Sequence, residues 1–353
     1  MRLLSRHVSS TVLSSILIVL LVMVSLNAVS AIIDSVDDIR GDFTFLALLA
    51  HVGITLPGTI YENIPFSGLI GCLVGLGLLA SNSELVVMRA AGVSLLRIVS
   101  FVLKPVIAVI IAGALIGEYL VPYTDQLAEG RKALLQGRQD HMASAGGFWN
   151  KENNEFVHVA VILPSGELFG VSRYSFNPEG DIDTVSFAAR ADFQGDSWLE
   201  EEVRITRFEE QGTVTEQVGQ RVWESNLSPD LLRLVMLEPA SLPISDLYEY
   251  SNYLEAQGQS ASRHWLAFWF KALQPLTTAS LVLIAVSFVF GPLRESTMGA
   301  RIFAGVVTGI VFSTSQELLG PASMVFGFSP LWSVLAPVGL CVLVGATLLR
   351  RAA

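Results

Sequence analysis

Charged side chains are scarce in this sequence. Asp, Glu, Lys and Arg make up 15% of its 353 residues, whereas 52% are hydrophobic and the mean hydropathy is +0.55. Soluble proteins carry about 25% charged residues, so the composition excludes an ordinary soluble domain and indicates a membrane protein. An apolar run of about 20 residues is needed to cross the hydrocarbon core of a bilayer. The runs of sufficient length predict six spans, at about 11–33, 52–80, 98–121, 265–290, 302–320 and 330–349.

Cysteine is almost absent, and so are the common catalytic and nucleotide-binding motifs. Cys72 and Cys341 both lie in apolar runs, which leaves the polar part of the chain without a disulfide or a thiolate metal site. No His-Glu-x-x-His and no Gly-x-x-x-x-Gly-Lys-Ser/Thr motif occurs. We therefore expect no catalytic residue, metal ligand or cofactor in this chain, and any ATP that drives it to be bound by a partner. The net charge of −10 does not suggest a nucleic-acid partner.

Positive charge near the span ends falls almost entirely on one side. Only Arg40 lies in a short loop on the other side. The positive-inside rule then places both termini, the 81–97 segment and the 291–301 loop in the cytoplasm. The first span could instead be a cleaved signal, but its apolar run exceeds the roughly 7–15 residues typical of one. The arginines that set this orientation are Arg2, Arg6, Arg89, Arg97, Arg294, Arg301, Arg350 and Arg351.

The stretch between the third and fourth spans is acidic and changes its periodicity. From Asp125 to Arg263 it carries 23 acidic and 11 basic side chains. Alternating patterns separated by turn residues favour a sandwich or a curved, half-open sheet. Such a sheet could hold acyl chains or pair with another sheet, or it could have a plainly filled core. The predicted strands are 155–162, 167–174, 184–193, 198–208 and 212–223, and Ser245 is expected to cap a helix over 245–254.

Several features of the spans have both a structural and a functional interpretation. Pro57 and Pro65 predict a bent second span. Three Gly-x-x-x-Gly pairs allow close helix packing, within this chain or against another. Ionisable residues at membrane depth serve either as structural contacts or as parts of a pathway. The glycine pairs are Gly71/Gly75, Gly113/Gly117 and Gly305/Gly309, and the ionisable residues are Glu62, Lys104, Glu118 and Glu317.

The order of parts and several local motifs resemble one family closely. Residues 69–77 (Leu-Ile-Gly-Cys-Leu-Val-Gly-Leu-Gly) and 83–92 (Ser-Glu-Leu-Val-Val-Met-Arg-Ala-Ala-Gly) are similar to the second span and coupling helix of the lipopolysaccharide-export ABC permeases LptF and LptG. The most specific motif is 287–294, Ser-Phe-Val-Phe-Gly-Pro-Leu-Arg, and the motifs together favour the LptG branch. Further similar segments are 116–119, 148–149 and 269–276.

This resemblance implies an α-helical membrane protein with six transmembrane helices and an inserted periplasmic β-jellyroll-like domain. The expected domains are 1–124 (spans one to three), 125–262 (the periplasmic part) and 263–353 (spans four to six), with a coupling helix at about 82–93. The permease would lie in the bacterial inner membrane. It would pair with LptF, sit on two copies of the ATPase LptB, and admit the helix of LptC beside its first span. It would then pass lipopolysaccharide to the bridge protein LptA.

The resemblance also assigns roles to particular residues. The ATPase-coupling set would be Ser83, Glu84, Val87, Met88 and Arg89. Glu84 has a simpler alternative explanation, since an acidic residue at a helix N-terminus is favoured by the helix dipole.

One departure from the family concerns the substrate. Family members commonly place basic residues near the outer ends of spans one and two, whereas residues 34–42 here read Asp-Ser-Val-Asp-Asp-Ile-Arg-Gly-Asp. Contact with lipid A phosphates would then depend on Arg40 and Arg131, on the partner permease or on bridging divalent cations.

Two other functions compete with lipopolysaccharide export. A mechanotransmitting or sensory membrane protein would couple the external β domain to a cytoplasmic partner without moving lipid. An intramembrane hydrolase is disfavoured because no nucleophile motif is present.

Overall fold

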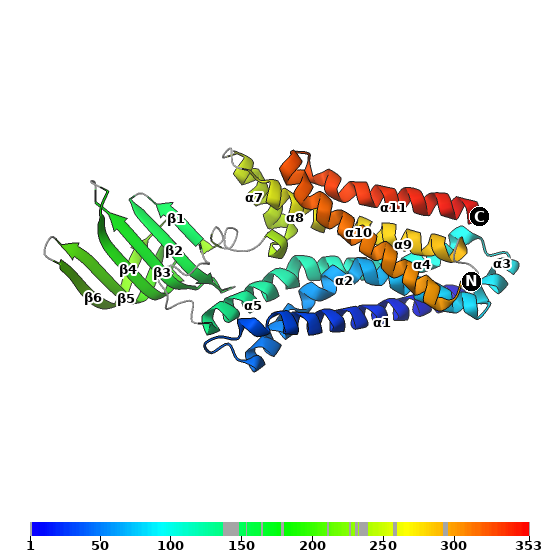
Figure 1. Ribbon diagram of the computed structural model, residues 1–353, viewed down its shortest axis with the longest axis horizontal. Helices are drawn as coiled ribbons and strands as arrows, with labels where there is room; N and C mark the ends of the chain where they lie inside the picture. Colours follow the sequence, from blue (N-terminus) through cyan, green and yellow to red (C-terminus); the bar gives the residue numbers. More distant parts are fainter. Residues whose placement is uncertain are drawn as a thin grey trace. The chain divides into compact units, whose positions relative to one another are not determined.

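The computed structural model describes residues 2–136, 148–152, 154–163, 165–177, 180–209, 212–225, 227–229, 232, 239–256, 260–291 and 296–352. These residues form two compact units (Figure 1). One consists of residues 1–30, 56–121 and 243–353, and is helical. The other consists of residues 31–55 and 122–242, and contains the sheet.

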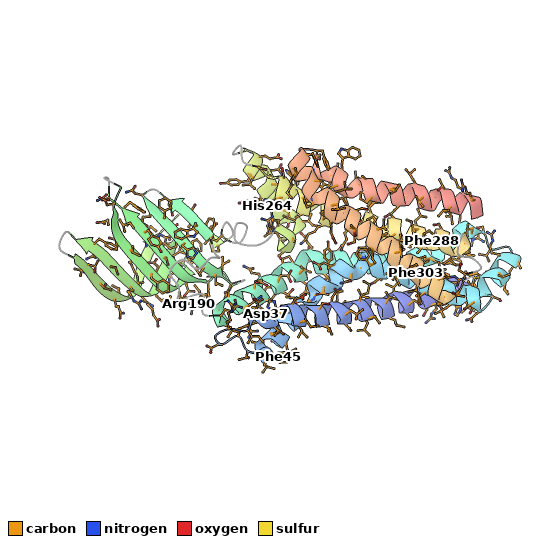
Figure 2. All side chains as sticks on the ribbon, viewed as in Figure 1. Asp37, Phe45, Arg190, His264, Phe288 and Phe303 are labelled. Atoms are coloured by element: carbon orange, nitrogen blue, oxygen red, sulfur yellow. The ribbon has the colours of Figure 1, made fainter. Side chains whose placement is uncertain are left out.

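Every predicted span is helical, and the predicted fold class is confirmed. Five helices are long and apolar enough to cross a membrane, and one bent pair brings the number to six among the described residues. Large apolar side chains on these helices are exposed, as expected of a surface that faces lipid; Phe303, 71% exposed, is one of them (Figure 2). The spans are α1 (Arg2–Asp34), α2 (Phe45–Ser81), α4 (Leu95–Leu115) continued by a π-helical turn (Ile116–Leu120) and α5 (Val121–Leu135), the pair α8 (Ser262–Ala272) and α9 (Gln274–Phe290), α10 (Met298–Phe326) and α11 (Pro330–Ala352).

The helix α2 is the one around which others pack. A Cβ atom added at Gly71 would lie 2.5 Å from Cα of Ile16 in α1, and one added at Gly75 would lie 3.0 Å from Cα of Val12. Gly113 and Gly305, on α4 and α10, leave room for the α2 side chains Ile64 and Leu73. All three Gly-x-x-x-Gly pairs therefore mediate packing within this chain, where small residues let two backbones approach closely.

The prolines affect the spans differently. Both Pro57 and Pro65 lie inside α2, which continues through them without a break. A bend of 50° lies between α8 and α9. Leu273 ends α8, and Pro275 occupies the first turn of α9, where its missing N–H costs no helical hydrogen bond.

The inserted domain is a single sheet of six described antiparallel strands, paired in their order along the chain. Each of the five predicted strands is present, and β1 was not predicted from its alternation. Of the two architectures left open by the sequence, the described residues form one sheet and not a two-sheet sandwich. The strands are β1 (Phe148–Glu152), β2 (Glu155–Ile162), β3 (Leu168–Phe176), β4 (Ile182–Phe193), β5 (Ser197–Glu209) and β6 (Gly212–Glu224).

One transverse row interrupts the pairing of strands β2 to β6. One residue of each of these strands is left out of the paired register, and these residues lie opposite one another on neighbouring strands: Ala160, Gly170, Ala189, Glu202 and Gly219. Gly170 and Glu202 have φ of +66° and +53°, which is a left-handed conformation that glycine adopts most readily. Each strand contributes one residue to the row, so the register is the same on both sides of it, unlike at a β-bulge, which adds a residue to one strand.

The sheet buries one apolar cluster and one ionic cluster. Trp198 is fully buried, and its Nε1 donates to the carbonyl of Leu227 at 2.8 Å. Glu200, whose side chain is 1% exposed, pairs with Arg221 at 2.7 Å and with Arg173 at 3.5 Å. The same Arg173 guanidinium lies 5.2 Å from the ring centroid of Trp223, so the ionic cluster adjoins the aromatic core.

Candidate functional site

The segment between spans two and three folds as a short helix, α3 (Glu84–Ala90). Ser83 turns the chain out of α2 with a left-handed φ of +60°. At the other end, the amide of Gly92 (φ +81°) donates to the carbonyl of Arg89 at 3.0 Å, and the amide of Val93 donates to that of Met88 at 3.1 Å. This pair of bonds is a Schellman motif, in which glycine terminates a helix and satisfies its last carbonyls. The apolar contact that usually accompanies the motif is present as well, because Val93 and Met88 are both buried in the same core cluster.

The two faces of α3 differ sharply. Leu85 and Met88 are each 5% exposed and pack into the core cluster that contains residues of α2, α4 and α9. Val86 and Val87 are 57% and 65% exposed, and Arg89 is exposed too. Of the predicted coupling set, the structure thus presents Ser83, Val87 and Arg89 at the surface and turns Met88 inward. Val86, which was not in that set, belongs to the exposed face.

Glu84 has a partner within the chain. Its Oε2 lies 2.8 Å from Nε2 of His7 in α1, and both side chains are partly exposed. The contact joins the start of the first span to the start of α3, 77 residues later. Sequence reasoning did not find His7, because nothing in the local pattern around it indicates a long-range contact.

A second long-range contact lies near the end of α2 that leads into α3. Arg301, in the first turn of α10, is 4% exposed, and its Nη1 donates to the carbonyl of Gly77 in α2 at 3.1 Å. The sequence had assigned Arg301 only to orientation. Burial of a guanidinium on a helix carbonyl shows that this residue also fixes α10 against the part of α2 that leads into α3.

The two predicted headgroup residues lie on segments that the structure brings together. Lys132 Nζ pairs with Oδ2 of Asp38 at 2.7 Å, and the amide of Asp42 donates to the carbonyl of Leu135 at 2.9 Å. These bonds hold the loop after α1 against the last turn of α5. Arg40 and Arg131, one on each segment, are both exposed. Lys132 is neutralised by Asp38, so Arg40 and Arg131 are the better placed of these cations to meet an anionic ligand.

Glu118, one of the four ionisable residues at membrane depth, acts as a helix cap. Its carboxylate accepts from the amide of Ile244 at 2.8 Å and from Oγ of Ser245 at 3.1 Å. These are the first residues of α7 (Ile244–Ala256), whose leading amides have no helical acceptor. Ser245 was predicted to be the N-cap, but the helix begins one residue earlier. The cap is instead a carboxylate from the π-helical turn, which the helix dipole also favours.

The other three ionisable residues are distributed differently. Lys104 Nζ donates to Oγ of Ser5 at 3.1 Å, and Glu317 accepts from Oγ of Ser313 at 2.8 Å. The Glu62 side chain is exposed on α2. No group of three or more metal-ligating side chains is present among the described residues.

Comparisons with known proteins cover almost the entire chain. Residues 6–351 match the family model described as lipopolysaccharide export system permease LptF/LptG. The chain is 33% identical over 352 residues to lipopolysaccharide export system permease protein LptG of Escherichia coli K12, an alignment that covers 99% of this chain and 98% of that protein. The identity to the LptG protein of Haemophilus influenzae is 32% over 351 residues, with the same coverage. The chain therefore belongs to the LptF/LptG family of lipopolysaccharide export permeases.

Proposed function

We propose that this chain is the LptG-type half of an ABC transporter that extracts lipopolysaccharide from the bacterial inner membrane and passes it to a periplasmic bridge toward the outer membrane. LptF would be the second permease half, and two copies of LptB would supply ATP hydrolysis. LptC would place its helix beside α1, and LptA would form the bridge. This chain would contribute no catalytic residue and bind no cofactor of its own.

The observation that carries the proposal is the construction of α3. Its outer face exposes Val86 and Val87, which is typical of a surface that another protein covers. Its inner face, Leu85 and Met88, belongs to the core of the membrane-spanning helices. Because packed cores resist compression, a push on the outer face would be transmitted to α2 and α4 and would not be absorbed locally. The contact of Glu84 with His7 would extend that connection to α1.

The orientation proposed from arginine distribution fits this role. It places α3 and both termini in the cytoplasm, where an ATPase would reach them, and the sheet in the periplasm. Lipopolysaccharide would meet the exposed Arg40 and Arg131 on the opposite side. Arg131→Glu is expected to reduce cross-linking of this chain to lipopolysaccharide, because a carboxylate repels lipid A phosphates; unchanged cross-linking would assign Arg131 a structural role.

The alternative of a sensory protein without transport is less well supported. It predicts that a cytoplasmic partner binds α3 while lipopolysaccharide still reaches the cell surface when this chain is depleted. The family match, which covers residues 6–351, favours export over that alternative.

The decisive test is a charge on the outer face of α3. Val87→Asp removes an apolar contact and buries a carboxylate in the docked complex, so co-purification with the ATPase subunit should fall by tenfold or more, on the order of 1.4 kcal/mol. Ser81→Asp adds the same charge at an exposed position just outside α3 and should leave co-purification unchanged. Equal co-purification of the two variants would remove α3 as the docking helix.

A further inference from the structure

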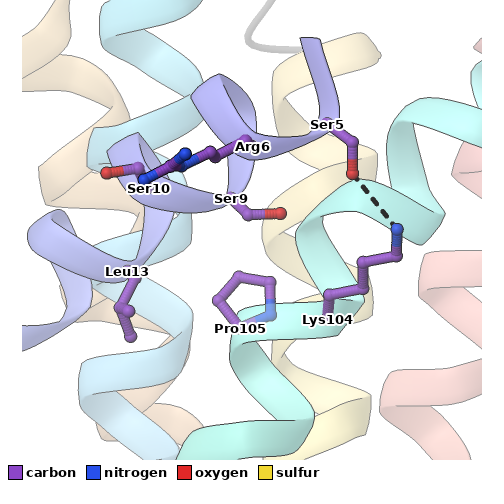
Figure 3. Close-up of a pocket in the computed structure, with 7 residues that line it drawn as sticks. All are labelled: Ser5, Arg6, Ser9, Ser10, Leu13, Lys104 and Pro105. Atoms are coloured by element: carbon purple, nitrogen blue, oxygen red, sulfur yellow. Dashed lines mark hydrogen bonds between the residues drawn. The ribbon is translucent and has the colours of Figure 1, made fainter. Parts of the chain in front are cut away.

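A groove of about 540 Å³ opens between the first turns of α1 and the first half of α4 (Figure 3). Arg6, Ser9 and Ser10 line it from α1, and Lys104 lines it from α4. The volume lies in the range of about 300–1,000 Å³ that is usual for small-molecule sites, so the groove is large enough for more than a single ion. All of its residues belong to the helical unit.

The groove concentrates positive charge and hydroxyl groups. In the part of the chain that the structure describes, neither Arg6 nor Lys104 has a carboxylate at salt-bridge distance. Lys104 donates one hydrogen bond, to Ser5 Oγ at 3.1 Å (Figure 3), and an ammonium group has three donors. Figure 3 shows the Arg6 side chain extending toward Ser10 and the Lys104 ammonium toward Ser5, so the two cations flank the groove. Cations on both sides of a groove at a membrane interface favour an anionic headgroup between them, whose hydrogen bonds to them would be charge-assisted.

The lower part of the groove is apolar and continues into an exposed apolar surface. Leu13 and Pro105 form the apolar part of the lining. Leu17, four residues after Leu13 on α1, is 51% exposed, and Ile107 and Ile111 on α4 are 52% and 55% exposed. Residues separated by three or four positions share a helix face, so these side chains extend the groove along the spans. Polar lining above and apolar surface below is the pattern of a phospholipid, with a charged headgroup and an acyl chain.

We propose that this groove binds an anionic phospholipid of the membrane, with its headgroup between Arg6 and Lys104 and an acyl chain along Leu17 and Ile111. This lipid is distinct from the exported one and lies at the end of the spans that carries α3. Only its assignment to the cytoplasmic leaflet rests on the proposed function. By contacting α1 and α4 together, the lipid would add to the contacts that already join them, which are the Ser5–Lys104 bond, the bond from Ser9 Oγ to the carbonyl of Phe101 at 2.8 Å and the shared apolar core.

The test uses the full chain, delipidated in an uncharged detergent, and native mass spectrometry with added phosphatidylglycerol or phosphatidylcholine of matched acyl chains. We expect the wild-type chain to retain phosphatidylglycerol preferentially. The double variant Arg6→Ala/Lys104→Ala should bind it about tenfold or more weakly, since two charge-assisted contacts are lost. Arg351→Ala, which removes an exposed cation from the C-terminal end of α11, should bind like the wild type, and Lys104→Arg should retain most of the affinity.

The source of the phosphate is distinguished by competition. Millimolar inorganic phosphate should not displace phosphatidylglycerol, because it lacks the acyl contacts; displacement would show that the site takes a soluble phosphate and would overturn the lipid assignment. Equal binding of the two phospholipids, or equal binding by the double variant, would also overturn it. So would a structure of an assembled complex with a partner helix filling the groove. None of these measurements needs an ATPase, so loss of lipid binding and loss of ATPase coupling are separate outcomes.

Discussion

Buried hydroxyls of the helical unit and the buried carboxylate of the sheet are bonded in different ways. In the helices, several buried hydroxyls bond to carbonyls one turn earlier on the same helix: Ser280 Oγ donates to the carbonyl of Thr277 at 2.8 Å, and Ser287 Oγ donates to that of Ile284 at 2.8 Å. In the sheet, Glu200 is held by arginines from β3 and β6. A span in lipid has no water to compensate an open polar group, so local bonding is the safest solution. The sheet instead connects three strands through one carboxylate, so its polar core depends on tertiary structure.

The comparison predicts that polar deletions are costly in the sheet and mild in the helices, whereas volume changes are costly in the helices. The helices approach one another at glycines that leave no space for a side chain.

The largest effect is expected for Glu200→Ala. Removing one partner of a buried ion pair typically costs about 3–5 kcal/mol, and the lower end applies here because Arg173 keeps Glu155 at 2.8 Å and the Arg221 side chain is 26% exposed. The amides of β4 and β5 should therefore exchange hydrogen about 100-fold faster or more in the full chain. Glu216→Ala is the matched control: Glu216 pairs with Arg207 at 3.7 Å, and both side chains are more than half exposed, so it should cost about 0–1 kcal/mol. Similar rates of amide hydrogen exchange in the two variants would show that the burial of Glu200 does not increase its contribution to stability.

An intermediate effect is expected for Gly71→Ala. The new methyl carbon would meet the α1 backbone at Ile16, 2.5 Å away, and backbone has no rotamer with which to yield. Such overpacking costs about 1–3 kcal/mol, measured as a lower melting temperature of the full chain in detergent. Gly339→Ala in α11 has nothing within 4 Å and should be neutral or slightly stabilising, because alanine is the better helix former. A melting temperature unchanged by Gly71→Ala would mean that α1 and α2 can separate freely.

Much of this architecture could be predicted from sequence because it depends on local patterns. Six long apolar runs gave the spans, and alternation gave β2 to β6. The strand β1 was missed because Phe148–Glu152 is short and has no clear alternation. The 50° bend between α8 and α9 was not predicted, because a bend was inferred only from Pro57 and Pro65, which lie in α2.

The site was predictable only in part, since its long-range contacts have no local signal. The resemblance of residues 83–92 to a coupling helix located α3. Only the structure shows that Met88 faces inward and that Val86 faces outward. The pairing of Glu84 with His7 and the burial of Arg301 on Gly77 join residues 77 and 224 positions apart. Periodicity within one helix carries no information about such pairs.

The smallest effect is expected for Ser287→Ala. The hydroxyl is fully buried, yet its one bond returns to its own helix at Ile284, and that carbonyl is also positioned to accept the usual helical amide. Removing donor and hydroxyl together leaves no unsatisfied partner, so the cost should be about 0.5 kcal/mol or less. The melting temperature of the full chain should fall by much less than for Gly71→Ala. A loss as large as that of Glu200→Ala would show that Ser287 bonds to another helix, and the contrast between the two units would then fail at a fully buried hydroxyl.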